Sequence, residues 1–122
     1  MTTLGHEEIE AQAAILRAAL EGLPGIAEKR MFGGLCFLLD GNMLCGTWKH
    51  GGMFRVGKDN ACAALRLPGA TPMTATGRAM AGLVTVSPDA LACEAHRTAL
   101  IGLALAFVGG LPPKPPGPLR RR

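Results

Sequence analysis

The sequence contains no tyrosine, and its aromatic residues are one tryptophan, Trp48, and four phenylalanines in a chain of 122 residues. Proteins that bind single-stranded nucleic acids usually stack the bases on aromatic rings, so a reader of that kind is disfavoured. The four cysteines form no Cys-x-x-Cys pair, and no histidine stands at zinc-finger spacing from them. We therefore expect no structural zinc and no other cofactor.

Long hydrophobic runs are also absent. The longest extends over the ten residues from Ala99 to Val108, whereas a membrane-spanning helix needs about 20. The first residues lack the basic and then apolar pattern of a secretory signal peptide. We expect no membrane partner and a cytoplasmic location. In that reducing compartment the cysteines remain free thiols; they are Cys36, Cys45, Cys62 and Cys93.

The positive charge of the chain is concentrated at one end. The net charge is +4, but residues 1–111 contain nine basic and nine acidic side chains. The excess comes from Lys114, Arg120, Arg121 and Arg122. We predict a single domain over residues 1–111 and a flexible tail rich in proline and arginine over residues 112–122. Such a tail attracts phosphate groups without sequence specificity.

Hydrophobic periodicity and turn residues predict an α+β fold. Its order is an N-terminal helix, an antiparallel β-meander, a short helix, two further strands and a long C-terminal helix. The helices are expected over residues 6–21, 60–67 and 88–108, and the strands over 26–30, 35–39, 43–49, 53–56, 73–75 and 79–86. Asp59 and Ser87 are predicted to cap the second and third helices. Gly51-Gly52 is predicted to form the turn before the fourth strand.

Asp40-Gly41, between two apolar runs, predicts a hairpin with a type I′ turn. Two registers remain open. A two-residue turn pairs Cys36 with Cys45, whereas a three-residue loop that includes Asn42 pairs Phe37 with Cys45. A redox pair requires the first register. We favour the other interpretation of the two cysteines, as inert apolar residues of a buried sheet.

No catalytic motif is recognisable. The histidines lie in separate segments, and a nucleophile pair of Cys93 and His96 would need an orienting third group and a cleft. Gly33-Gly34 lacks the spacing of either glycine-rich phosphate-binding loop and is expected to form a bend between strands. The acidic residues at positions 7, 8 and 10 fit a solvated first helical turn. We expect no enzymatic activity and no catalytic residues.

Basic side chains recur along the meander and its turns, at Lys29, Arg30, Lys49, Arg55 and Lys58. Gathered into one patch, they would form a surface for nucleic acid or for an acidic partner. The favoured alternative is a scatter of solvated side chains. The last helix presents apolar residues on nearly all sides over 99–108, which predicts burial on more than one side. The surfaces that could pack against this helix are the sheet, the first helix, and either a second copy of the chain in a homodimer or another protein.

Several segments together resemble the TfoX N-terminal domain family. They are Arg30-Met31-Phe32-Gly33-Gly34, Leu39-Asp40-Gly41, Met53-Phe54-Arg55-Val56, Gly77-Arg78-Ala79-Met80 and Leu111-Pro112-Pro113-Lys114. The resemblance extends from the first helix to about Lys114 and implies the α+β order given above. It also implies no established catalytic residues to carry over.

The family is linked to the regulation of natural DNA uptake in bacteria, and its regulatory members are thought to act with a transcription factor of the cyclic-AMP receptor type. The resemblance therefore implies a short stand-alone member that acts through protein-protein contacts, with a transcription factor among the candidate partners. The alternative is a small nucleic-acid-binding accessory protein that uses the basic meander and the Arg-rich tail.

Overall fold

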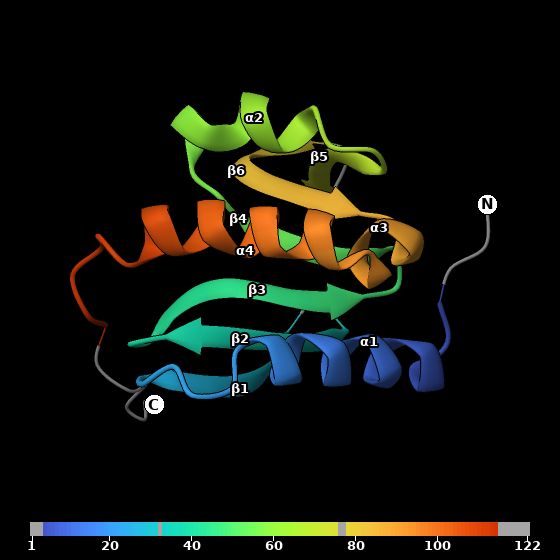
Figure 1. The fold of residues 1–122 in the computed structure, drawn as a ribbon, viewed down its shortest axis with the longest axis horizontal. Coiled ribbons are helices and arrows are strands. Elements are labelled where there is room, and N and C mark those ends of the chain that lie inside the picture. The colour runs from blue at the N-terminus through green and yellow to red at the C-terminus, as the bar shows by residue number, and fades with distance from the viewer. Residues whose placement is uncertain (1–3, 32, 76–77, 115–122) are drawn as a thin grey trace.

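The computed structural model describes residues 4–31, 33–75 and 78–114, which form an α+β fold with one antiparallel sheet (Figure 1). The strands are β1 (Ile26–Met31), β2 (Gly34–Leu39), β3 (Asn42–Trp48), β4 (Gly51–Arg55), β5 (Ala70–Ala75) and β6 (Arg78–Val86). The helices are α1 (His6–Ala19), α2 (Ala61–Leu65), α3 (Pro88–Ala92) and α4 (Glu94–Val108), with a 3₁₀ turn, η1 (Lys58–Asn60), before α2. The spatial order β1-β2-β3-β4-β6-β5 confirms the predicted meander and fold class.

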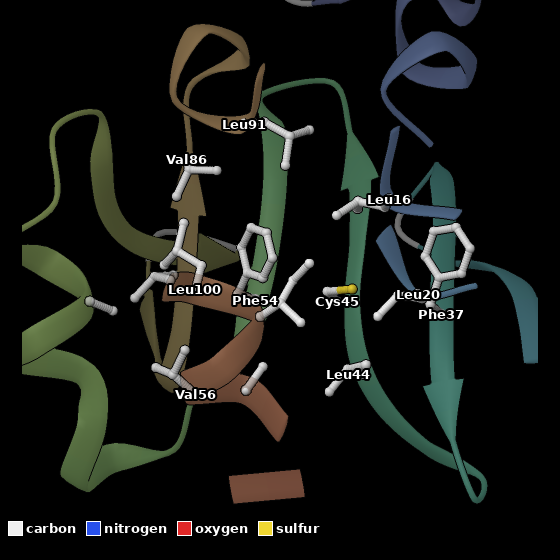
Figure 2. Close-up of a cluster of buried hydrophobic side chains, with 14 of the residues drawn as sticks. Leu16, Leu20, Phe37, Leu44, Cys45, Phe54, Val56, Val86, Leu91 and Leu100 are labelled. Atoms are coloured by element: carbon white, nitrogen blue, oxygen red, sulfur yellow. The ribbon is translucent and has the colours of Figure 1, made fainter. Parts of the chain in front are cut away.

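The main core lies between the sheet and the helices. Figure 2 shows Phe37, Cys45 and Phe54, from three neighbouring strands, among side chains of the helices that include Leu16 and Leu100. All five are buried. Since burial of a large apolar side chain stabilises a fold by about 1.5–3 kcal/mol, this layer dominates the stability of the domain.

The β2–β3 hairpin combines features of both predicted registers. Asp40 and Gly41 have φ angles of 51° and 88°, as a type I′ turn requires. Beyond the turn, a bulge shifts the register, so that Phe37 pairs with Cys45 and Cys36 pairs with Gly46. The bulge turns two consecutive apolar residues of β3, Leu44 and Cys45, toward the same core.

One turn prediction and one capping prediction are wrong. The β3–β4 turn is formed by Lys49 and His50, and Gly51-Gly52 begins β4 instead of forming the turn. Gly51 has a φ of 121°, and a Cβ there would meet the carbonyl oxygen of Val86, so this glycine permits close approach of β4 and β6. Asp59 lies inside η1 and caps neither η1 nor α2 through its side chain.

The predicted single helix over residues 88–108 is divided into α3 and α4 at Cys93, whose ψ is 115°. An interruption leaves carbonyl groups without helical partners. Nη1 of Arg97 donates to the carbonyl oxygens of Leu91 at 3.0 Å and Ala92 at 3.3 Å. These hydrogen bonds stabilise the interruption.

Ser87 caps α3 as predicted, since its Oγ accepts a hydrogen bond from the backbone N–H of Ala90 at 3.2 Å. Ser87→Ala is expected to lower the free energy of unfolding by about 1 kcal/mol, because loss of a serine N-cap leaves a helix donor unsatisfied. For a chain of this length the melting temperature then falls by about 4 °C. Thr98→Ala, on the exposed side of α4, is the control for thermal unfolding by circular dichroism. Equal shifts in the two variants would contradict the capping role.

The chain after α4 returns to the β2–β3 hairpin. The N–H of Lys114 donates to the carbonyl oxygen of Asp40 at 2.7 Å, and Nδ2 of Asn42 donates to the carbonyl oxygen of Pro112 at 2.9 Å. The first residues of the predicted tail are therefore held against the domain. Arg120, Arg121 and Arg122 lie outside the described residues.

The C-terminal half of α4 is covered unevenly. Leu100, Ile101, Ala104 and Val108 are buried, whereas Leu103, Leu105 and Phe107 are half-buried. The helix packs on β3, β4 and α3, and self-association through its remaining surface stays a prediction. Within the described ranges, no helix has the length and apolar character needed to cross a membrane.

Candidate functional site

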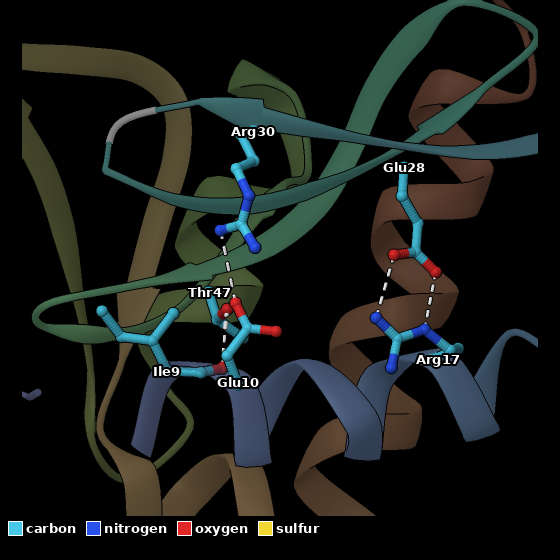
Figure 3. Close-up of polar contacts among 6 residues, drawn as sticks. All are labelled: Ile9, Glu10, Arg17, Glu28, Arg30 and Thr47. Carbon is cyan, nitrogen blue, oxygen red and sulfur yellow. Dashed lines mark hydrogen bonds and ion pairs between the residues drawn. The ribbon is translucent and has the colours of Figure 1, made fainter. Parts of the chain in front are cut away.

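Arg30 is the first residue of the family segment Arg30-Met31-Phe32-Gly33-Gly34, and its side chain helps to join β1 to α1 (Figure 3). Its Nη1 lies 3.3 Å from Oε2 of Glu10. Two turns further along α1, Arg17 binds Glu28 with both Nε and Nη2, at 2.6 and 2.9 Å. The hydrogen bond from Arg17 lowers the pKa of Glu28 below its ordinary value. These pairs are solvent-exposed, so they orient the helix on the edge strand more than they stabilise it.

The glycines of the motif have structural roles. Gly33, in the β1–β2 connection, has a φ of 74°, which favours glycine. Gly34 begins β2, and a Cβ there would meet the backbone carbonyl of Thr47 in β3. Oγ1 of Thr47 in turn donates to the carbonyl oxygen of Ile9 at 3.2 Å, which fixes α1 on the sheet. Phe32 lies outside the described residues.

Asp40 and Gly41, which form the turn between β2 and β3, also position the chain that follows α4. A Cβ on Gly41 would meet the backbone carbonyl of Lys114. The carbonyl oxygen of Asp40 accepts the hydrogen bond from the N–H of that same residue. The absence of a side chain at position 41 therefore allows the chain after α4 to dock on the hairpin.

The predicted basic surface is divided among several places. Lys29 and Arg30 are adjacent in β1 and so point to opposite faces of the sheet. Lys49 lies in the turn before β4, whereas Arg55 and Lys58 lie at or beyond its other end, about 16 Å away along the strand. The guanidinium of Arg55 lies 5.6 Å from the ring centroid of Phe107, within cation-π range. The structure does not bring the five side chains into one patch.

A sulfur-rich cluster on the face of the sheet opposite the helices was not predicted. It contains every methionine of the described ranges, with Cys36 and Trp48 and the adjacent Leu83. Met53 and Met73 are fully buried, whereas Met31, Met43 and Met80 are half-buried. Each of these methionines lies in a strand, which is the signal that sequence analysis could have used.

The profile of the TfoX N-terminal domain matches residues 18–108, about three quarters of the chain. The chain belongs to the TfoX N-terminal domain family. The match begins within α1 and ends with α4, so residues 111–114 of the sequence resemblance fall outside it. Neither the curated proteins nor the solved structures contain a match.

In this TfoX N-terminal domain, Cys36 and Cys45 face opposite sides of the sheet. Cys36 belongs to the sulfur-rich cluster and Cys45 to the main core. Burial raises the pKa of the Cys36 thiol to about 11 and also raises the pKa of Cys45. Since the thiolate is the reactive form, both cysteines are inert at neutral pH, and their placement does not form a redox pair.

Thiol labelling tests this placement. Cys62 is exposed and Cys93 is half-buried, so we expect a disulfide reagent to label Cys62 rapidly and Cys93 more slowly in the folded protein. Cys36 and Cys45 should react only as the protein unfolds, because they are buried and protonated. Quantitative mass spectrometry of labelled peptides measures each rate. Labelling of all four thiols at one rate in the folded domain would contradict the structure.

The Cys93–His96 pair does not gain the setting of a nucleophile in this TfoX N-terminal domain. Cys93 is the N-cap of α4, and Nδ1 of His96 is buried with no hydrogen-bond partner among the described residues. Neither residue lines the cavity beside Trp48 or the one beside Leu20. The described part of the chain also contains no group of three or more histidines, cysteines or acidic residues placed to hold a metal ion.

Proposed function

We propose that this TfoX N-terminal domain is a non-enzymatic, cytoplasmic regulatory module that acts by binding another protein, in transcriptional or competence-related regulation. Membership of the family supports the regulatory setting. The observation that carries the protein contact is the sulfur-rich cluster. Its three half-buried methionines, Met31, Met43 and Met80, lie on the sheet face opposite the helices.

The chemistry of these residues suits a protein contact. Thioether side chains are unbranched and polarisable, and they adapt to apolar side chains of different shapes. The fully buried Met53 and Met73 belong to the same cluster and support the three half-buried methionines. Lys29 is exposed and shares its strand face with Met31 by alternation. These features favour a partner that presents apolar side chains beside an acidic residue, and a transcription factor is the proposed class.

Affinity capture from the cytoplasm of the source cell, followed by titration of the purified partner, tests this proposal. Met43→Lys and Met80→Lys should each weaken binding by about tenfold or more, because a charge is placed in an apolar contact. Leu65→Lys is the matched control, since Leu65 is an exposed leucine of α2, outside the sulfur-rich cluster. Arg30→Gln and Arg55→Gln test whether the dispersed basic residues contribute.

Two results would contradict the proposal. One is a partner whose affinity is unchanged by both methionine substitutions but lowered by Leu65→Lys. The other is recovery of no partner above background together with a measurable enzymatic turnover. Circular dichroism of each variant confirms that the fold is retained.

The second candidate is an accessory protein that binds nucleic acid, and the concentration of excess positive charge in residues 114–122 favours it. Phosphate contacts would make the affinity for DNA fall steeply with salt. Truncation after Leu111 separates the tail from the domain. Complete loss of DNA binding in the truncated chain would show that the tail binds DNA and that the basic residues of the meander do not.

A further inference from the structure

A cavity of about 370 Å³ opens beside the β3–β4 turn. Its lining includes Trp48, Lys49 and His50, together with Thr71 of β5 and Thr85 of β6. The β3–β4 turn and α3 lie at the same end of the sheet (Figure 1), and the cavity lining also includes Leu4 and Pro88, the first residue of α3. Its lining includes neither the Gly33-Gly34 nor the Asp40-Gly41 turn, and the methionines of the proposed partner contact do not line it.

The backbone around the cavity is held in place. The N–H of Leu4 donates to the carbonyl oxygen of Lys49 at 2.7 Å, which anchors the turn. The rings of Trp48 and His50 meet edge to face, with centroids 4.7 Å apart and planes at 86°. Trp48 pairs in register with Gly51, so the neighbouring strand supplies no side chain to fill the space beside the indole.

The polar groups of the cavity favour an anion. Lys49 and His50 are its ionisable lining residues, and no described residue of the lining is acidic. Thr85 is only 8% exposed, and its Oγ1 has no hydrogen-bond partner among the described residues. A buried hydroxyl without a partner is unfavourable, and a ligand oxygen would satisfy it.

The apolar part of the lining favours an organic ligand over a bare ion. The indole of Trp48 and the ring of Pro72 both line the cavity. Its volume also falls within the usual range of small-molecule sites, which combine apolar walls with a few polar groups. A ring or short chain can occupy the space between these walls.

We propose that this cavity binds a small organic anion, in which a carboxylate or phosphate is attached to an apolar ring or chain. Lys49 holds the anionic group by its charge, and a ring N–H of His50 donates a hydrogen bond to it. The hydroxyl of Thr85 donates to a ligand oxygen, and Trp48 and Pro72 contact the apolar part. This site shares Trp48 with the sulfur-rich cluster, but none of the methionines of the proposed protein contact lines it.

Intrinsic fluorescence measures binding at this site directly, because Trp48 is the only tryptophan of the chain. Phenyl phosphate and benzoate are titrated separately at constant ionic strength, and their comparison distinguishes a phosphate from a carboxylate site. At least one of them should give a saturable change with a Kd of about 1 mM, as expected for a ligand of this size. Phenol, which has the ring without the charge, should bind about tenfold more weakly.

Variants assign the polar contacts. Lys49→Gln and Thr85→Val should each raise the Kd of the bound probe by about fivefold or more, since each removes a contact to the anionic group. Lys29→Gln and Thr98→Val are the matched controls, because neither residue lines the cavity, and they should leave the Kd unchanged. If Thr85→Val lowers the melting temperature, only the Kd of the Lys49→Gln variant is used to assign the polar contacts, because Lys49 is exposed and its substitution should leave the fold intact.

Three results would overturn the proposal. The first is no saturable change in Trp48 fluorescence with either probe up to about ten times the expected Kd. The second is equal affinity for phenol and for the anions. The third is an unchanged Kd in Lys49→Gln. None of these results bears on the methionine-dependent protein contact, so the two proposals fail independently.

Discussion

Gly34→Ala is expected to destabilise the domain by about 3 kcal/mol and to lower its melting temperature by about 12 °C. The reason is steric. The added Cβ would meet the carbonyl of Thr47 and lie 2.9 Å from Cα of Trp48, so β2 and β3 would have to separate. Both contacts are with backbone atoms, which cannot move aside as the end of a flexible side chain can. Differential scanning calorimetry measures the change.

Gly102→Ala is the matched control for this prediction. Gly102 is exposed in α4, and a Cβ there would meet nothing within 4 Å. The same substitution should therefore stabilise the protein by about 0.5–1 kcal/mol, because alanine has the higher helix propensity. A melting temperature of Gly34→Ala within about 2 °C of the parent would show that β2 and β3 tolerate the methyl group.

Phe54→Ala is expected to lower the free energy of unfolding by about 3–5 kcal/mol. Phe54 is fully buried near the centre of the main core, between residues contributed by the sheet and by α4 (Figure 2). Its truncation removes apolar contacts and leaves a cavity that the rigid sheet closes only partly. Since a domain of this kind is stable by about 5–15 kcal/mol in total, the variant should show a much lower urea midpoint.

Leu65→Ala provides the comparison for the core substitution. Leu65 is 36% exposed, and its truncation should cost less than about 1 kcal/mol. An equal m-value in the parent and in Phe54→Ala would confirm that the native states have similar compactness. A loss below about 1.5 kcal/mol for Phe54→Ala would contradict the central position of this side chain.

The sheet therefore presents two different surfaces. The helix-side surface is closed by α1 and α4 and provides most of the stability. The opposite surface contains the sulfur-rich cluster, and the proposed anion site lies at one end of the sheet. Trp48 belongs to the cluster and also lines the cavity, so its fluorescence can report on both proposed contacts.

The candidate surface could be predicted from the sequence only in part. The sequence identified the basic residues but not their separation, because the distance between Lys49 and Arg55 depends on where β4 begins. It also could not show that Arg30 pairs with Glu10, a contact between elements 20 residues apart. The methionines are visible in the sequence, but their common face depends on strand register and bulges that local patterns do not specify.

The sequence by itself determined the fold class, the type I′ turn at Asp40-Gly41 and the cap at Ser87, because these depend on local backbone preferences and hydrophobic periodicity. The tertiary structure alone decided the bulge that pairs Phe37 with Cys45, since Leu44 and Cys45 are both apolar and only the packing of α1 and α4 directs both to one core. It likewise decided the close approach at Gly51, which depends on β6, a strand about 30 residues further along the chain. Local preferences act over a few residues, whereas these features require contacts between distant segments that form only in the folded protein.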